Sequence, residues 1–223
     1  MPIDQKKLIE VLDSMREEFI KDPENSIRSK RFISKMHEYC IYELKRLGIN
    51  EKKVQIKPEP TIFTSHKPKD IDVAVIEEDN GPLIAISVKS QMSSIAKNFM
   101  GYYENLIGDV IGLHDKFPFL VVGMLYLLPL KIIRKNSEGK LRTESYDLVK
   151  IEELFRAVSN RKDWDDRPSK YEHFAMLIVD FEKDPPQIVN NIPVDKSLRI
   201  EDFFDKLLRT YKERNPFLRI TKS

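Results

Sequence analysis

The stretch KDIDVAVIEEDNGPLIAISVKSQ, residues 69–91, decides the fold class. Two runs of Val, Ile, Leu and Ala, at about 71–77 and 83–89, flank an Asp-Asn-Gly-Pro segment that is typical of a tight turn, so the stretch predicts a β-hairpin. Charged residues stand at the ends of these strands, because Asp72 begins the first and Lys89 ends the second. A buried ammonium group needs an anionic partner, so we expect either an Asp72–Lys89 ion pair at the rim of a sheet or a functional site.

The second of these strands is apolar on both faces until its end, which is typical of a central strand covered on both sides. The spacing of apolar residues elsewhere predicts five helices, over 4–21, 26–47, 93–114, 148–160 and 199–213, and three further strands, over 53–64, 119–128 and 173–182. The polar segment 134–145 is expected to be an exposed loop. No repeat or Gly/Ser-rich linker divides the chain, so we predict one α/β domain over 1–223, with a mixed central β-sheet flanked by helices.

Charge and cysteine usage limit the classes of function. The net charge is only +2, yet Ser26–Lys57 holds nine Lys or Arg and three Glu, which indicates either a polyanion-binding surface or a solvated helix face. Cys40 is the only cysteine, which excludes an intramolecular disulfide and a thiolate metal cluster. The N-terminus has no apolar signal core, and the most apolar run, Phe119–Leu128, is ten residues, half the length of a membrane helix. We therefore expect a cytoplasmic protein.

The predicted helix over 93–114 has an unusual composition. It contains three of the seven glycines of the chain, Gly101, Gly108 and Gly112. Each glycine costs a helix interior about 1 kcal/mol relative to Ala. Their spacing places them on one face with Lys97 and Glu104. A glycine face lets another backbone come close, so we expect it to lie against the end of the Lys89 strand and to bring Glu104 toward Asp72. The alternative is close helix–sheet packing, with Glu104 bonded to another polar group.

The order of these elements and the sequence Ser87-Val88-Lys89 resemble the PD-(D/E)xK nuclease superfamily, and within it the type II restriction endonucleases. The resemblance covers a core of about residues 30–128. In the superfamily an acid stands two residues before the lysine, where this chain has Ser87. A subset of restriction endonucleases keeps Ser-x-Lys and takes the second acid from the following helix. Glu104 stands fifteen residues after Lys89, slightly further along than the acid of that subset.

The resemblance implies a restriction-endonuclease-like fold and a Mg²⁺-dependent enzyme that cuts both strands of a short, palindromic site in double-stranded DNA. A homodimer is expected, and tetramers also occur in the subset. Mg²⁺ prefers oxygen ligands, which the resemblance assigns to Asp72, Glu104 and the carbonyl of Val88. Lys89 would position or activate the attacking water and offset charge on the phosphate. Contacts to DNA are expected from Gln91, Ser94, Lys97 and Asn98, and from the segments 134–145 and 160–170.

Several alternatives stay open. Asp70 shares a face with Asp72 and is the alternative first acid, and Glu38 is either a further acid of the metal site or a solvated glutamate. The alternative functions are a repair or structure-specific nuclease of the same fold, a non-catalytic DNA-binding module, and a metal-free scaffold protein. The four histidines lack the spacing of a zinc hydrolase, and no glycine-rich phosphate loop is present in the sequence.

Overall fold

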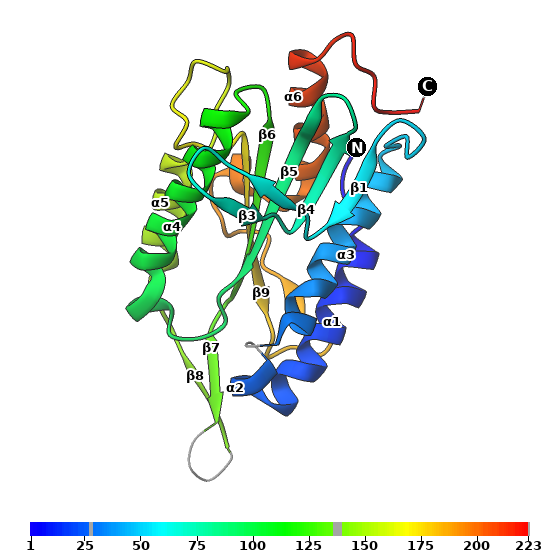
Figure 1. Ribbon diagram of the computed structural model, residues 1–223. Coiled ribbons are helices and arrows are strands. Elements are labelled where there is room, and N and C mark those ends of the chain that lie inside the picture. Colours follow the sequence, from blue (N-terminus) through cyan, green and yellow to red (C-terminus); the bar gives the residue numbers. More distant parts are fainter. Residues whose placement is uncertain (27–28, 136–139, 223) are drawn as a thin grey trace.

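A six-stranded sheet runs through the centre of the protein (Figure 1). The computed structural model describes residues 1–26, 29–135 and 140–222. The strands follow one another across the sheet in the order β1 (Gln55–Pro58), β4 (Val73–Glu77), β5 (Gly81–Ser90), β6 (Val121–Pro129), β9 (His173–Asp180) and β10 (Gln187–Ile188). Neighbours in β1–β4–β5 and in β9–β10 are antiparallel, whereas β5, β6 and β9 are parallel. The prediction of a mixed α/β sheet is confirmed.

Helices cover both faces of this sheet (Figure 1). One face carries α1 (Gln5–Lys21), α3 (Lys30–Arg46) and α6 (Phe203–Arg214). The other face carries α4 (Ile95–Lys116) and α5 (Leu148–Ala157). The short helix α2 (Pro23–Ser26) lies between α1 and α3, and two 3₁₀ turns, Lys196–Leu198 and Ile200–Asp202, precede α6. Residues of β5 alternate between the two cores, with Ile84 and Ile86 on the α3 side and Ala85 on the α4 side. The strand is thus central and covered on both sides, as its sequence predicts.

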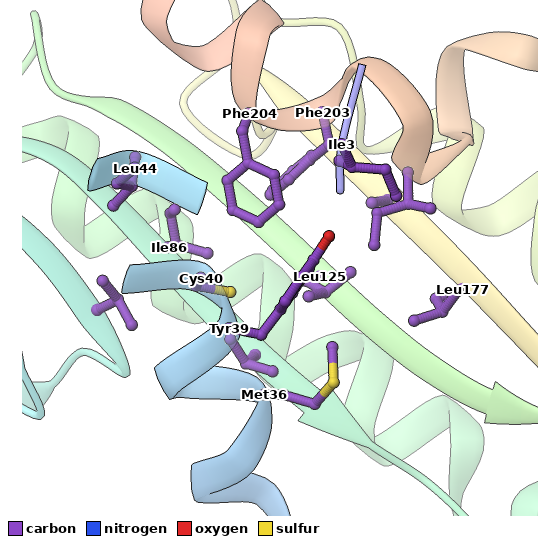
Figure 2. Packing of buried hydrophobic residues seen from close by; sticks show 14 of the residues in the cluster. Ile3, Met36, Tyr39, Cys40, Leu44, Ile86, Leu125, Leu177, Phe203 and Phe204 are labelled. Carbon is purple, nitrogen blue, oxygen red and sulfur yellow. The ribbon is translucent and has the colours of Figure 1, made fainter. Parts of the chain in front are cut away.

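Aliphatic and aromatic side chains pack together in the core under α3 and α6 (Figure 2). The ring of Tyr39 on α3 meets the edge of Phe204 on α6, with ring centroids 6.0 Å apart. Helix α6 approaches β6 closely at Gly123, where an added Cβ would lie only 2.8 Å from the Phe203 ring. A larger residue at Gly123 would therefore overpack this side of the sheet.

Two segments differ from their predicted form. The predicted strand over 53–64 is divided at its prolines, which lack a donor for a ladder, into β1 and β2 (Thr61–Phe63). β2 pairs with β3 (Pro68–Asp70) in a separate two-stranded sheet. The expected loop over 134–145 is wrong where the structure describes it, because β7 (Ile132–Lys135) and β8 (Leu141–Glu144) form an antiparallel ribbon. Residues 136–139 of this segment lie outside the described part of the chain.

A buried carboxylate ties the start of β9 to its surroundings. Glu172 is fully buried and accepts hydrogen bonds from the guanidinium groups of Arg161, at 2.8 Å, and Arg214, at 2.7 Å. It also accepts a bond of 2.7 Å from the main-chain N–H of Val122 and lies 3.2 Å from Nε2 of His114. This cluster joins β6 and β9 to α4 and α6 through charge-assisted bonds.

Within the described residues, no helix combines the length and the apolar character that crossing a membrane requires.

Candidate active site

Asp72 lies at the fork where β4 and β5 separate. The last paired residue before the fork is Val73, which faces Ile86 on β5. Just beyond it, Oδ2 of Asp72 accepts the main-chain N–H of Val88 at 2.7 Å. The carboxylate thus takes the place of a main-chain carbonyl and extends the ladder by one residue before the start of β4. Its side chain is 20% exposed, so the carboxylate stays accessible from solvent.

The partner of Asp72 is a histidine and not Lys89. His37 on α3 is buried, and its Nε2 lies 3.4 Å from Oδ1 of Asp72. The expected Asp72–Lys89 ion pair is wrong, because Lys89 makes no ion pair or hydrogen bond with any residue that the structure describes. Lys89 directly follows Val88, whose main-chain N–H bonds Asp72, and its charge lowers the pKa of the His37 imidazole. The packing of α3 against β4 and β5 brings the imidazole to the carboxylate.

Glu59 provides a second carboxylate near the fork. Its main-chain N–H donates to the carbonyl of Asp72 at 3.0 Å, and its Oε1 lies 3.8 Å from Nδ1 of His37. The imidazole of His37 therefore has one carboxylate beside each ring nitrogen. Glu59 has a φ of 47°, in the left-handed region that residues other than glycine rarely adopt. Residues held in this region concentrate at functional sites. The sequence signal that marks Glu59 is its position between two prolines.

Burial is the main influence on the pKa of His37. Burial and the nearby ammonium of Lys89 lower the pKa of the His37 imidazole, whereas the negative charges of Asp72 and Glu59 raise this pKa. Burial has the largest effect, so the pKa of His37 lies below its ordinary value of 6.5. Nε2 of His37 has no hydrogen-bond partner among the described residues. A buried imidazole whose Nε2 has no hydrogen-bond partner in the described chain, with a carboxylate beside each ring nitrogen, indicates a polar site that an incoming group can complete.

We expect NMR titration of the histidine side chains to show His37 protonating below pH 6.5. In Asp72→Asn the pKa of His37 should fall further, because the substitution removes the charge that raises it most. The measurement is a pH series of ¹H–¹³C spectra of both proteins, with the exposed His66 as internal reference. A higher pKa of His37 in Asp72→Asn would contradict the contact between these two side chains.

Glu104 does not take its expected place beside Asp72. Leu106 and Val110 make the buried face of α4, and Glu104 points about 200° away from Leu106, into solvent. It makes no hydrogen bond or ion pair with the residues described. The expected close approach is wrong for Gly101 and Gly108, where an added Cβ would meet no atom within 4 Å. The physical reason is that α4 turns its apolar stripe toward the sheet, which leaves Gly101, Glu104 and Gly108 exposed to solvent. Gly112 alone of the three glycines is buried, and an added Cβ there would lie 3.0 Å from Oγ1 of Thr64, not against the end of β5.

The other candidate acids lie apart from the fork. Asp70 belongs to β3 and accepts a hydrogen bond from the hydroxyl of Thr61, so Asp72, and not Asp70, adjoins β5. Glu38 is exposed on α3, and its charge contributes to raising the pKa of His37. In the described ranges, no set of three or more His, Cys, Asp and Glu side chains is already arranged around a metal position. Asp72 and Glu59 are the carboxylates that could hold a hard cation together with water and substrate oxygens.

The residues predicted to contact DNA follow β5. Lys97 and Asn98 are exposed on the first turn of α4. Ser94 adopts a left-handed conformation with φ of 53° and makes no side-chain bond to the helix end. Gln91 is buried, its Oε1 accepts from the hydroxyl of Tyr126 at 2.8 Å, and its Nε2 has no partner among the described residues. Lys97 and Asn98 are thus accessible to a ligand at the end of β5, whereas Gln91 is buried directly after the C-terminal end of this strand.

The candidate active site consists of Asp72, His37, Glu59 and Lys89, four side chains at the β4–β5 fork. The main-chain N–H of Val88 fixes the position of Asp72, and the imidazole of His37 lies 3.4 Å from its carboxylate. Lys89 has no ion-pair or hydrogen-bond partner in the described chain. No protein-family model matches this chain, and no curated protein or solved structure matches it.

Proposed function

We propose that the protein is a Mg²⁺-dependent nuclease with a restriction-endonuclease-like fold, acting as a type II restriction endonuclease that hydrolyses both strands of double-stranded DNA. The observation that carries the proposal is the carboxylate of Asp72 bound to the N–H of Val88, one residue before Lys89, at the fork between two strands. The chain order supports it, since the elements on which the resemblance to the superfamily rests follow one another as α3, β1, β4, β5, α4 and β6, with the small sheet of β2 and β3 inserted between β1 and β4.

The side chains at the fork suit phosphodiester hydrolysis. A bound Mg²⁺ would polarise the phosphate and acidify a water molecule, and it needs only one or two carboxylates from the protein. Asp72 would provide the first carboxylate, oriented by its hydrogen bond from the N–H of Val88. Lys89 is intermediate in exposure and makes no ion pair with a described residue, so its ammonium is available to the phosphate or the attacking water.

Neutralising one glutamate at a time identifies the second acid. Glu59→Gln should lower the Mg²⁺-dependent cleavage rate about 10- to 100-fold, the cost typical of losing a group that supports a metal site. The reason is that the main chain of Glu59 bonds that of Asp72 and its carboxylate lies 3.8 Å from Nδ1 of His37. Glu104→Gln should cleave at the rate of the unmodified protein, because its side chain faces solvent. The measurement is the cleavage rate of supercoiled DNA as Mg²⁺ is varied. If Glu104→Gln lowers the cleavage rate and Glu59→Gln does not, Glu104 is the second acid.

Digestion of phage DNA separates this proposal from its alternatives. Discrete fragments that form with Mg²⁺ and not with EDTA are the expected result, and sequencing their ends gives the site. A smear, or preferential cutting of branched DNA, would indicate a repair or structure-specific nuclease. Binding without cleavage would indicate a non-catalytic module. Because a two-fold symmetric site is read by a two-fold symmetric protein, sedimentation should give a homodimer, or a tetramer built from such dimers.

A further inference from the structure

The ribbon formed by β7 and β8 carries more positive than negative side chains. The segments 131–135 and 140–144 hold five Lys or Arg and one acid. In the ribbon Arg134 stands directly opposite Arg142. Like charges at directly opposite positions destabilise a pair of strands, so the ribbon on its own gains nothing from this pairing.

The two arginines are only partly compensated. Arg134 is 54% exposed and lies 3.4 Å from the carboxylate of Glu144 on the same ribbon. Arg142 is exposed and makes no ion pair or hydrogen bond with any residue that the structure describes. The face that carries both guanidinium groups is therefore open and cationic.

The base of the ribbon is fixed to the body of the protein. Ile132 and Ile133 are buried, and one contributes to each of the two cores. The hydroxyl of Tyr146, just after β8, donates to the carbonyl of Pro129, just before β7. An isolated pair of strands is marginal in water, and this anchoring lets a short ribbon keep its shape.

The ribbon follows the C-terminal end of β6, at the same end of the sheet as the C-terminal end of β5, which carries Lys89. β5 and β6 are parallel, Lys89 lies beside Tyr126, and β6 ends three residues later at Pro129. In Figure 1 the ribbon projects from the end of the protein at which α4 begins. A polyanion lying across this end of the sheet can contact the ribbon and Lys89 together.

We propose that this ribbon enters the major groove of duplex DNA and that Arg134 and Arg142 contact guanine edges or the flanking phosphates. This inference rests on the proposed nuclease function and names the element that grips the substrate. The major groove of B-DNA is about 12 Å wide and admits a two-stranded ribbon. Strands of four residues span about 13 Å, which matches it. The major groove of A-form RNA is too deep and narrow for side chains to read, so the partner is DNA.

The test compares a ribbon variant with a matched surface variant. Binding of a fluorescein-labelled DNA duplex is measured by anisotropy in EDTA over about 50–200 mM salt. Arg134→Gln/Arg142→Gln should weaken binding and reduce the slope of log K against log salt by about 2, because each phosphate contact contributes about 0.9. The control Lys7→Gln/Arg209→Gln removes two exposed cations from α1 and α6, each already paired within its helix, and should leave the slope unchanged.

Methylation of guanine N7, which lies in the major groove, provides a second readout. Methylation should weaken binding of the unmodified protein and have no effect on Arg134→Gln/Arg142→Gln. Thermal unfolding of both variants should match the unmodified protein, because the four side chains are exposed. The inference would be overturned if the ribbon variant kept both the salt slope and the methylation sensitivity of the unmodified protein. It would also be overturned if the control variant lost as much DNA binding as the ribbon variant.

The outcomes also separate this inference from the proposed function. If the protein binds duplex DNA through the ribbon but does not cut it with Mg²⁺, the inference about the ribbon holds and the proposed nuclease function is wrong. If Arg134→Gln/Arg142→Gln cuts DNA as well as the unmodified protein, the proposed nuclease function holds and the inference about the ribbon is wrong.

Discussion

Asp72→Asn is expected to reduce Mg²⁺-dependent DNA cleavage by about 100- to 1000-fold, the cost typical of removing a group that stabilises transition-state charge. The substitution removes the negative charge that would hold the cation. The fold should persist, because the amide oxygen of asparagine can still accept the N–H of Val88. Single-turnover cleavage of a labelled duplex measures the effect, and DNA binding in EDTA should remain at least as tight as in the unmodified protein.

Asp70→Asn is the matched control for this experiment. It makes the same chemical change two residues earlier, at an exposed position in the two-stranded sheet of β2 and β3. Cleavage by Asp70→Asn should stay within a few-fold of the unmodified rate, since Asp70 bonds to Thr61 and lies outside the fork. If Asp70→Asn abolishes cleavage and Asp72→Asn preserves it, the assignment of the first acid is wrong.

Glu172→Gln should lower the free energy of unfolding by about 3–5 kcal/mol, as expected when a buried ion pair loses one partner. The side chains of Arg161 and Arg214 are 1% and 8% exposed, so both guanidinium groups would stay buried without their carboxylate. For a chain of this length the change corresponds to a decrease of roughly 10 °C in melting temperature. Urea unfolding followed by circular dichroism measures it.

Glu182→Gln is the control for Glu172→Gln. Glu182 pairs with Lys131 at 3.0 Å, but the two side chains are 39% and 44% exposed. Exposed ion pairs contribute about 0–1 kcal/mol, so this variant should unfold close to the unmodified protein. A loss of less than about 1 kcal/mol in Glu172→Gln would show that the buried cluster does not stabilise the fold.

The contribution of Glu172 should also depend on pH. Burial by itself would raise the pKa of Glu172, but the imidazole of His114, the charge of Arg214 and the N–H of Val122 lower it from 4.5 to about 2. Because the pKa in the folded state lies below that in the unfolded state, the stabilisation is complete above about pH 4.5 and is lost as the pH falls toward 2. The difference in stability between the unmodified protein and Glu172→Gln should therefore shrink over this window.

The sequence alone determined the local architecture. Alternation and run length predict the β4–β5 hairpin and a central β5 covered on both faces, because strand periodicity is a property of neighbouring residues. The same local pattern placed Asp72 at the edge of a strand. The prolines near Glu59 marked the end of β1 without indicating which sheet the following residues would join.

The tertiary structure decided which side chains surround Asp72. Helix α4 has an apolar face and a face that carries Glu104. Burial of apolar residues such as Leu106 and Val110 contributes about 1.5–3 kcal/mol each, so the apolar face turns toward the sheet and Glu104 stays in water. His37 reaches Asp72 from a position 35 residues earlier in the chain, because α3 packs across β4 and β5. Rotation of a helix about its axis and contacts between distant segments depend on the packing of the whole core, and no local pattern of residues specifies them.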